Sequence, residues 1–383
     1  MIKTFAAAPM SLFGYGSRKE LIPLLKREGV KKALVVTDKV LFEIGIVSKI
    51  TEVLDEAQIA YTIYKDVTPN PTLDNVENGS ARYKEENCDF IVAIGGGSAN
   101  DCAKAINVLI SNGGSIKDYQ GGNKSKNKGK LLVAINTTAG TASEISRAYL
   151  ISDEKEKRKL IFKDDYAMPS IAVNDIELMM GLPKSITAQT GMDALTHAIE
   201  GLVSKNNSVL TNILAIKAIE LIYKYLPKAV EDLGNVEARD AMAYGQYIAG
   251  LSFGNAGLGL VHAMAHQIGA TYNLPHGLCN AVLLPEIMEF NKNSCIKDYA
   301  LIAESIKPIE CINMTEKEKA SYAVRLIKEL SERVGTSQSL TDIGVKEEDI
   351  DILAEKSLQD GCIFTSPVMP TKEEIINILR RLM

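Results

Sequence analysis

The chain changes its secondary-structure pattern near Pro183. Before that residue, short β-branched and aliphatic runs alternate with segments that have the apolar spacing of amphipathic helices, and after it strand-like runs nearly vanish. Such alternation is typical of a parallel sheet whose two faces are covered by helices. A length of 383 residues suits two domains of ordinary size. The sequence therefore predicts an α/β domain over residues 1–182 and an all-helical domain over residues 183–383.

Four strands are expected in the first half of the chain, over residues 33–37, 59–64, 89–94 and 131–135. Apolar residues at i, i+3, i+4 spacing indicate helices around residues 21–25 and 102–110. In the second half, helical patterns cover residues 187–202, 210–225, 236–251 and 259–270, and later helices are expected to break at Pro275, Pro285, Pro308 and Pro370. A cleft between two such halves is a common place for a ligand.

Composition and charge narrow the classes of partner. A formal net charge of −5 argues against nucleic acid, and the lysine-rich stretch 123–130 is expected to be a solvated loop. No apolar run approaches the roughly eighteen residues of a membrane span, and the first residues show no cleavable signal pattern. The six cysteines form no CxxC pair. We therefore expect a cytoplasmic protein with reduced thiols and no membrane partner.

A run of glycines, Gly95-Gly96-Gly97-Ser98, follows the third expected strand and precedes a helix expected to begin near Asn100. Glycine lets the backbone approach a ligand closely, and the free N–H groups of a helix N-terminus attract an anion. The spacing differs from the GxGxxG of the common dinucleotide-binding fold, so a tight turn that binds nothing remains an alternative.

Two further segments strengthen the case for a dinucleotide. Asp38 directly follows the first strand, where its carboxylate can accept the hydroxyls of an adenosine ribose, although a helix cap is the simpler alternative. The segment 136–141, Asn-Thr-Thr-Ala-Gly-Thr, follows the fourth strand. Open α/β sheets bind ligands at the carboxyl ends of their strands. The pattern therefore predicts a dinucleotide site, and Asp38 favours NAD(H) over NADP(H).

The chain has only four histidines, and their spacing indicates a metal site. His197 follows Asp193 by four residues, and His262 and His266 are also four apart, so each pair projects from one face of a helix. His276 follows ten residues later. Imidazoles with one carboxylate suit a divalent cation such as iron or zinc. Because five candidate donors exceed the four that a metal with an open position needs, we expect one histidine to have another role.

The segments 95–104, 136–144, 191–200 and 259–285 occur in the order and spacing of one family. The chain resembles the iron-containing (group III) alcohol dehydrogenases along its whole length, and among them looks closest to 1,3-propanediol dehydrogenases and lactaldehyde reductases. The resemblance implies their fold, which dehydroquinate synthase shares: an N-terminal dinucleotide-binding α/β domain followed by an all-helical metal-binding domain. It also implies NAD(H) and Fe²⁺, for which Zn²⁺ can substitute.

The resemblance assigns a role to each site residue. Asp193, His197, His262 and His276 are the implied metal ligands, and His266 lies beside the nicotinamide and substrate as a catalytic residue. The implied cofactor contacts are Asp38, Asn70, Gly96, Gly97, Ser98, Thr137, Thr138, Thr141, Lys159 and Leu178. Phe253 and Cys362 border the implied substrate pocket. Ser366 and Val368 stand where close relatives usually carry Asn and often carry Arg, which leaves the natural alcohol open.

The implied activity interconverts a small primary alcohol or diol and its aldehyde, as an aldehyde reductase of fermentative metabolism in a homodimer or larger homo-oligomer. The metal acts as a Lewis acid on the substrate oxygen, and His266 relays the proton. One alternative is a metal- and NAD-dependent lyase of the dehydroquinate-synthase type, which would carry more lysine and arginine near the histidines for a phosphorylated polyol. A zinc peptidase would need a glutamate where Ala263 stands.

Overall fold

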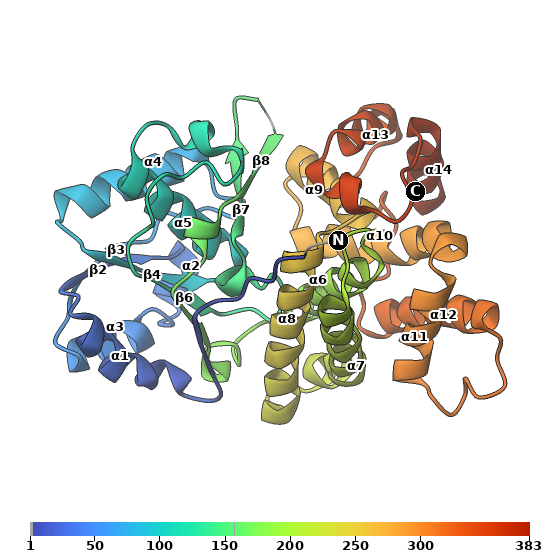
Figure 1. Cartoon of the computed structure of the whole chain (residues 1–383), viewed down its shortest axis with the longest axis horizontal. Helices are drawn as coiled ribbons and strands as arrows, with labels where there is room; N and C mark the ends of the chain where they lie inside the picture. Colours follow the sequence, from blue (N-terminus) through green and yellow to red (C-terminus); the bar gives the residue numbers. More distant parts are fainter. Residues whose placement is uncertain (1–2, 157) are drawn as a thin grey trace. The chain divides into compact units, whose positions relative to one another are not determined.

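The computed structural model describes residues 3–156 and 158–383, and these form two compact units. The first, called the α/β unit here, consists of Ala7–Thr138 and Ala142–Gly181. The second, called the helical unit, consists of Leu182–Met383 together with residues 3–6 and Ala139–Thr141. In Figure 1 the α/β unit runs from blue to green, and the segment Leu182–Met383 of the helical unit continues from green to red.

Six parallel strands form the main sheet of the α/β unit, in the spatial order β1-β9-β6-β4-β2-β3. Their bounds are β1 (Met10–Phe13), β2 (Lys32–Val36), β3 (Ala60–Tyr64), β4 (Phe90–Gly95), β6 (Leu132–Asn136) and β9 (Ile171–Asn174). The expected parallel sheet is confirmed, and the four expected strands appear as β2, β3, β4 and β6 with ends shifted by at most one residue. The sequence did not reveal β1 and β9, which are only four residues long.

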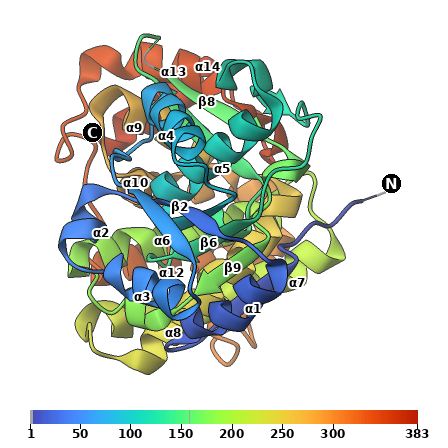
Figure 2. The same cartoon turned by 90° about the vertical axis from the view of Figure 1, so that its left-hand side faces the viewer.

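Helices cover both faces of this sheet because successive strand residues point to opposite sides. Leu34 and Ile91 share one core with α4 (Leu73–Glu85) and α5 (Gly97–Asn112). Val35 and Val92 share another core with α1 (Leu21–Glu28) and α3 (Ser48–Glu56). Figure 2 shows β2, β6 and β9 between these two helix layers. The short helix α2 (Lys39–Glu43) follows β2 directly.

A second, three-stranded sheet was not expected from the sequence. It joins β5 (Gly121–Gly122), β8 (Arg158–Lys163) and β7 (Ala148–Asp153), and β7 and β8 are antiparallel. Three of the six β8 residues are basic, which hides the strand from a search for apolar runs. The lysine-rich stretch 123–130 contains no helix or strand and is mostly exposed, so the expected solvated loop is confirmed.

The helical unit contains nine α-helices among its described residues: α6 (Lys184–Val203), α7 (Val209–Glu231), α8 (Val236–Ala256), α9 (Leu260–Tyr272), α10 (His276–Asn291), α11 (Ile296–Ile306), α12 (Glu316–Arg333), α13 (Ile350–Leu358) and α14 (Lys372–Leu382). The four helical patterns expected between residues 187 and 270 appear as α6 to α9. The expected break at Pro285 is wrong, because this proline lies inside α10. Its buried neighbours Leu283, Leu284 and Ile287 hold the helix in the core although one backbone donor is missing.

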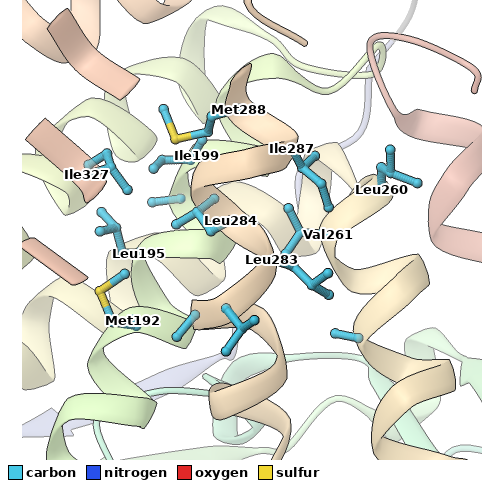
Figure 3. Packing of buried hydrophobic residues seen from close by; sticks show 14 of the residues in the cluster. Met192, Leu195, Ile199, Leu260, Val261, Leu283, Leu284, Ile287, Met288 and Ile327 are labelled. Atoms are coloured by element: carbon cyan, nitrogen blue, oxygen red, sulfur yellow. The ribbon is translucent and has the colours of Figure 1, made fainter. Parts of the chain in front are cut away.

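The core of the helical unit fixes the positions of α6, α9 and α10. Figure 3 shows Met192, Leu195 and Ile199 of α6 beside Leu284 and Met288 of α10. Each fully buried aliphatic side chain of this kind contributes about 1.5–3 kcal/mol relative to an exposed one. The three helices are therefore held together by apolar packing before any ligand is considered.

Within the described part of the chain, no single helix has the length and hydropathy needed to cross a bilayer. The consecutive helices α8 and α9 pass that test only when taken together, and they meet at a bend of 103°. None of the six cysteines forms a disulfide in the described part of the chain.

Candidate metal centre and cofactor loop

Four side chains of the helical unit bring their ligand atoms within 4.8 Å of one another. They are Asp193 and His197 of α6, His262 of α9 and His276 of α10. The Oδ1 atom of Asp193 lies 4.0 Å from Nε2 of His262 and 3.5 Å from Nε2 of His276. Metal–ligand bonds of about 2.0–2.2 Å to one central cation would span such separations.

The helices place these four donors with little freedom. Asp193 and His197 are one turn apart on α6, so they share a face as expected. The start of α10 approaches α6 so closely that a β-carbon on Gly277 would lie 2.5 Å from the backbone oxygen of Gln189. Glycine at position 277 therefore allows the close contact that brings His276 to Asp193.

The burial of the donors and its effect on their protonation suit a cation. Asp193, His197 and His262 are at most 4% exposed, whereas the side chain of His276 is 26% exposed. Burial lowers the pKa of His197 to about 4, against an opposing effect of Asp193. The imidazole of His197 is therefore neutral at pH 7, which is the state that binds a metal.

Asn280, which the sequence did not single out, provides an independent indication of where a cation fits. Its Nδ2 lies 2.6 Å from Asp193 Oδ1 and 3.2 and 3.1 Å from the Nε2 atoms of His262 and His276. Its buried Oδ1 has no hydrogen-bond partner among the described residues. Three lone-pair-bearing atoms thus converge on one donor group, so the residues present fit a divalent cation. In the sequence, the only signal for Asn280 is its position four residues after His276.

His266 lies outside this group of four. Its Nδ1 is 3.0 Å from Oδ2 of Asp360, and its ring stacks on that of His276 with centroids 5.4 Å apart. Asp360 also accepts hydrogen bonds from Nε2 of Gln267 and the backbone N–H of Cys362. Burial alone would raise the pKa of Asp360, but His266 and the Cys362 hydrogen bonds bring it below its usual value. Sequence reasoning missed Asp360, which is 94 residues away from its partner.

The two residues expected to border the substrate lie against these histidines. The ring of Phe253 stacks on that of His197, with centroids 4.2 Å apart and an interplanar angle of 16°. Cys362 belongs to a short 3-10 helix, η8 (Gly361–Thr365), and its ligand atom lies within 4.8 Å of those of His266 and Asp360.

In the α/β unit, the glycine loop joins β4 directly to α5. The helix begins at Gly97, so the expected start near Asn100 is three residues too late. Gly96 is the extended N-cap, and the side chain of Asn100 donates hydrogen bonds to the carbonyls of Gly95 and Gly96. Gly95 has a φ of +155°, and a β-carbon there would lie 2.6 Å from that of Ala99. The loop therefore requires glycine at position 95.

A cavity of about 340 Å³ lies beside this loop, within the range of small-molecule sites. Four of the expected cofactor residues line it: Asp38, Gly96, Gly97 and Ser98. Oδ1 of Asp38 accepts a hydrogen bond of 2.9 Å from the backbone N–H of Leu41. Asp38 therefore caps α2, and this bond uses one of the two carboxylate oxygens.

The other expected cofactor residues are distributed more widely. Thr138 borders the loop, since a β-carbon on Gly96 would lie 3.1 Å from its Oγ1, and the N–H of Thr137 donates to the carbonyl of Gly95. Asn70, in a left-handed conformation, follows a proline that lines the cavity. The described lining does not include Lys159 on β8 or Leu178 in η5 (Ile176–Leu178), and Thr141 belongs to the helical unit.

Comparison with known proteins assigns the chain to a family. A model described as "Iron-containing alcohol dehydrogenase" matches residues 8–176, and one described as "Fe-containing alcohol dehydrogenase family, C-terminal" matches residues 187–383. Alcohol dehydrogenase 4 of Schizosaccharomyces pombe is 44% identical over 100% of this chain and 89% of its own length. Lactaldehyde reductase of Escherichia coli is 40% identical over 96% of each chain.

A solved structure supports the same assignment. The crystal structure of a 1,3-propanediol oxidoreductase superposes with a TM-score of 0.98 at 39% identity and covers 100% of both chains. The parallel α/β unit, the following helical unit and the Asp-His cluster all occur where the family resemblance predicted them. The chain therefore belongs to the iron-containing alcohol dehydrogenase family.

Proposed function

We propose that this protein is a metal-dependent, NAD(H)-linked oxidoreductase that interconverts a small primary alcohol or diol and its aldehyde. We further propose that it works as an aldehyde reductase in fermentative metabolism. The cluster of Asp193, His197, His262 and His276 is the observation that carries the proposal. The names of the relatives, which include lactaldehyde and 1,3-propanediol, support small hydroxylated substrates. The family assignment favours this activity over the dehydroquinate-synthase-type lyase.

The four clustered residues are proposed to hold Fe²⁺, or Zn²⁺ in its place. Bound there, the cation supplies a Lewis acid that stabilises negative charge on the substrate oxygen. The chain keeps three of the four ligands almost completely buried, and charges interact more strongly in such surroundings than in water. Phe253, which stacks on His197, and Cys362 are proposed to border the substrate and exclude water from it.

His266 is proposed to move the proton between the substrate oxygen and solvent. An ionised Asp360 can only accept hydrogen bonds, so its contact with Nδ1 of His266 leaves Nε2 as the nitrogen that exchanges the proton. Imidazole is the side chain that most often transfers protons in enzymes.

Residues 1–182 are proposed as the NAD(H)-binding domain and residues 183–383 as the metal-binding and catalytic domain. The N–H groups at the start of α5 suit the diphosphate of the cofactor, and Asp38 suits its ribose. The roles of Asn70, Thr137, Thr138, Thr141, Lys159 and Leu178 rest on the family resemblance. The cytoplasmic location and the homodimer or larger assembly stay predictions.

The direct test is the change in nicotinamide absorbance when the Fe²⁺-loaded protein is given NADH and a panel of short aldehydes, and NAD⁺ with the matching alcohols and diols. We expect turnover in both directions, with preference among chain lengths and hydroxyl positions identifying the substrate. Turnover of a phosphorylated polyol without net change in NADH would support the lyase instead.

Asp38→Gly is expected to raise the ratio of kcat/KM for NADPH to that for NADH by about ten- to several-hundred-fold. The Asp38 carboxylate would face the 2′-phosphate of NADP, and like charges a few ångströms apart cost roughly one to several kcal/mol at intermediate dielectric. Each tenfold change in the ratio corresponds to about 1.4 kcal/mol. Glu43→Gln removes a charge from α2 outside the cavity lining and should leave the ratio unchanged. An unchanged ratio in Asp38→Gly would show that Asp38 serves only as the cap of α2.

A further inference from the structure

Another buried acid–imidazole contact lies next to the metal cluster. Glu200, near the end of α6, is 5% exposed, and its Oε2 lies 2.6 Å from Nδ1 of His262. We propose that Glu200 is a positioning residue, which aims His262 at the cation and supplies the second negative charge of the centre. This inference rests on the proposed metal-dependent function.

The contact determines which nitrogen of His262 is available. An ionised carboxylate only accepts hydrogen bonds, so Nδ1 carries the hydrogen and donates it to Glu200. Nε2 is then the nitrogen with a lone pair. A second contact agrees with this tautomer, because the amide Nδ2 of Asn280 lies 3.2 Å from Nε2 of His262 on the side of Asp193. A hydrogen bond of this kind fixes the ring orientation and raises the basicity of the ligating nitrogen.

The carboxylate of Glu200 is itself held from the backbone. Oε2 accepts from the N–H of Gly259 at 2.9 Å, and Oε1 accepts from the N–H of Val261 at 2.7 Å. Both donors belong to the start of α9, one to three residues before His262. A β-carbon on Gly259 would lie 2.9 Å from Oε1, so glycine is what permits this approach. Glu200 therefore sets both the rotation of the His262 ring and the place where its helix begins.

Charge balance also favours a role for Glu200 at the metal centre. Among the four clustered donors only Asp193 carries a negative charge, and a dication beside it would leave one uncompensated positive charge in a buried site. Uncompensated buried charge is costly. Glu200 contacts His262 directly and adds a second negative charge next to the four donors, whereas the carboxylate of Asp360 contacts His266, which is outside them. If Glu200 only capped the start of α9, it would not need to balance the charge of a cation.

The experiment measures Co²⁺ binding to metal-free protein by visible absorption, in competition with a chelator. Glu200→Gln keeps the size of the side chain and an oxygen that can accept, but removes the charge. We expect it to bind Co²⁺ about 10–100-fold more weakly, as is usual when a partner of a ligating histidine is lost. The visible spectrum of the bound Co²⁺ should also change. Gly259→Ala, which displaces the carboxylate without changing any charge at the centre, should weaken binding in the same direction.

The matched control is Glu374→Gln, because Glu374 also accepts a backbone N–H at a helix start, that of Thr371 before α14. Its Co²⁺ affinity should equal that of the wild type. If Glu200→Gln binds Co²⁺ with wild-type affinity and spectrum, and only the melting temperature of the metal-free protein falls, Glu200 is a structural cap and the inference is wrong. If the wild type itself binds no Co²⁺, the proposed metal-dependent function fails, and this inference fails with it.

Discussion

Asp193→Ala is expected to lose its metal and at least about a thousandfold in turnover. Asp193 is the only anionic member of the cluster, and its Oδ1 lies within 4.0 Å of the ligating nitrogens of His262 and His276. A Lewis acid contributes several kcal/mol of charge stabilisation, and each tenfold in rate corresponds to about 1.4 kcal/mol. His197→Ala, His262→Ala and His276→Ala should show the same joint loss.

Metal content and kcat measured on the same purified samples check this expectation. Asp298→Ala is a suitable control, because Asp298 is a half-buried carboxyl of α11 outside the cluster, and its metal content should stay at the wild-type level. A variant of the four that keeps its full metal and near-normal turnover would have to be removed from the ligand set.

His266→Ala is expected to keep its metal and lose about 10²–10⁴-fold in kcat, the usual contribution of a positioned acid–base group. The reason is that His266 pairs with Asp360 outside the four-donor cluster, so its removal leaves the coordination intact while the proton path is interrupted. Added imidazole should restore part of the turnover, since the deleted ring leaves space for it.

The same metal and rate measurements distinguish proton transfer by His266 from two other roles. A fall in metal content as large as that of Asp193→Ala would identify His266 as a fifth ligand, and the proton-transfer role would be wrong. No rescue by imidazole at full metal content would point to a packing role against His276, on which the ring stacks.

The parts of the fold that follow local periodicity could be predicted from the sequence. Apolar strands such as β4, buried along its whole length, and helices such as α6 have patterns that depend only on their neighbours in the chain. By contrast, β8 is stabilised by pairing with β7 and β5, and its basic residues conceal it. The helix break predicted at Pro285 was wrong for a related reason, since tertiary packing in the core outweighs a local helix-breaking tendency.

In the candidate site too, contacts within one helix could be predicted from the sequence, and contacts between distant segments could not. Asp193 and His197 share one helix turn, so their juxtaposition follows from spacing alone. Asp360 reaches His266 from 94 residues away, and Glu200 reaches His262 from 62 residues away. Such contacts depend on how α6, α9 and the segment after α13 pack together, which one sequence without its fold does not reveal. The start of α5 at Gly97 was missed because the glycines before it have no apolar periodicity.

The burial of α6 bears on how such proteins diverge. Every residue from Gly191 to Val203 is buried, so nearly any change there disturbs either the apolar core or the ligands that the helix carries. The segment around η8 is different, because Phe364 is 65% exposed and Cys362 only half-buried, yet this segment reaches His266. A change at an exposed position such as Phe364 should therefore cost less stability than a change in α6. Substitutions at such positions could alter the surroundings of His266 while the four clustered donors stay in place.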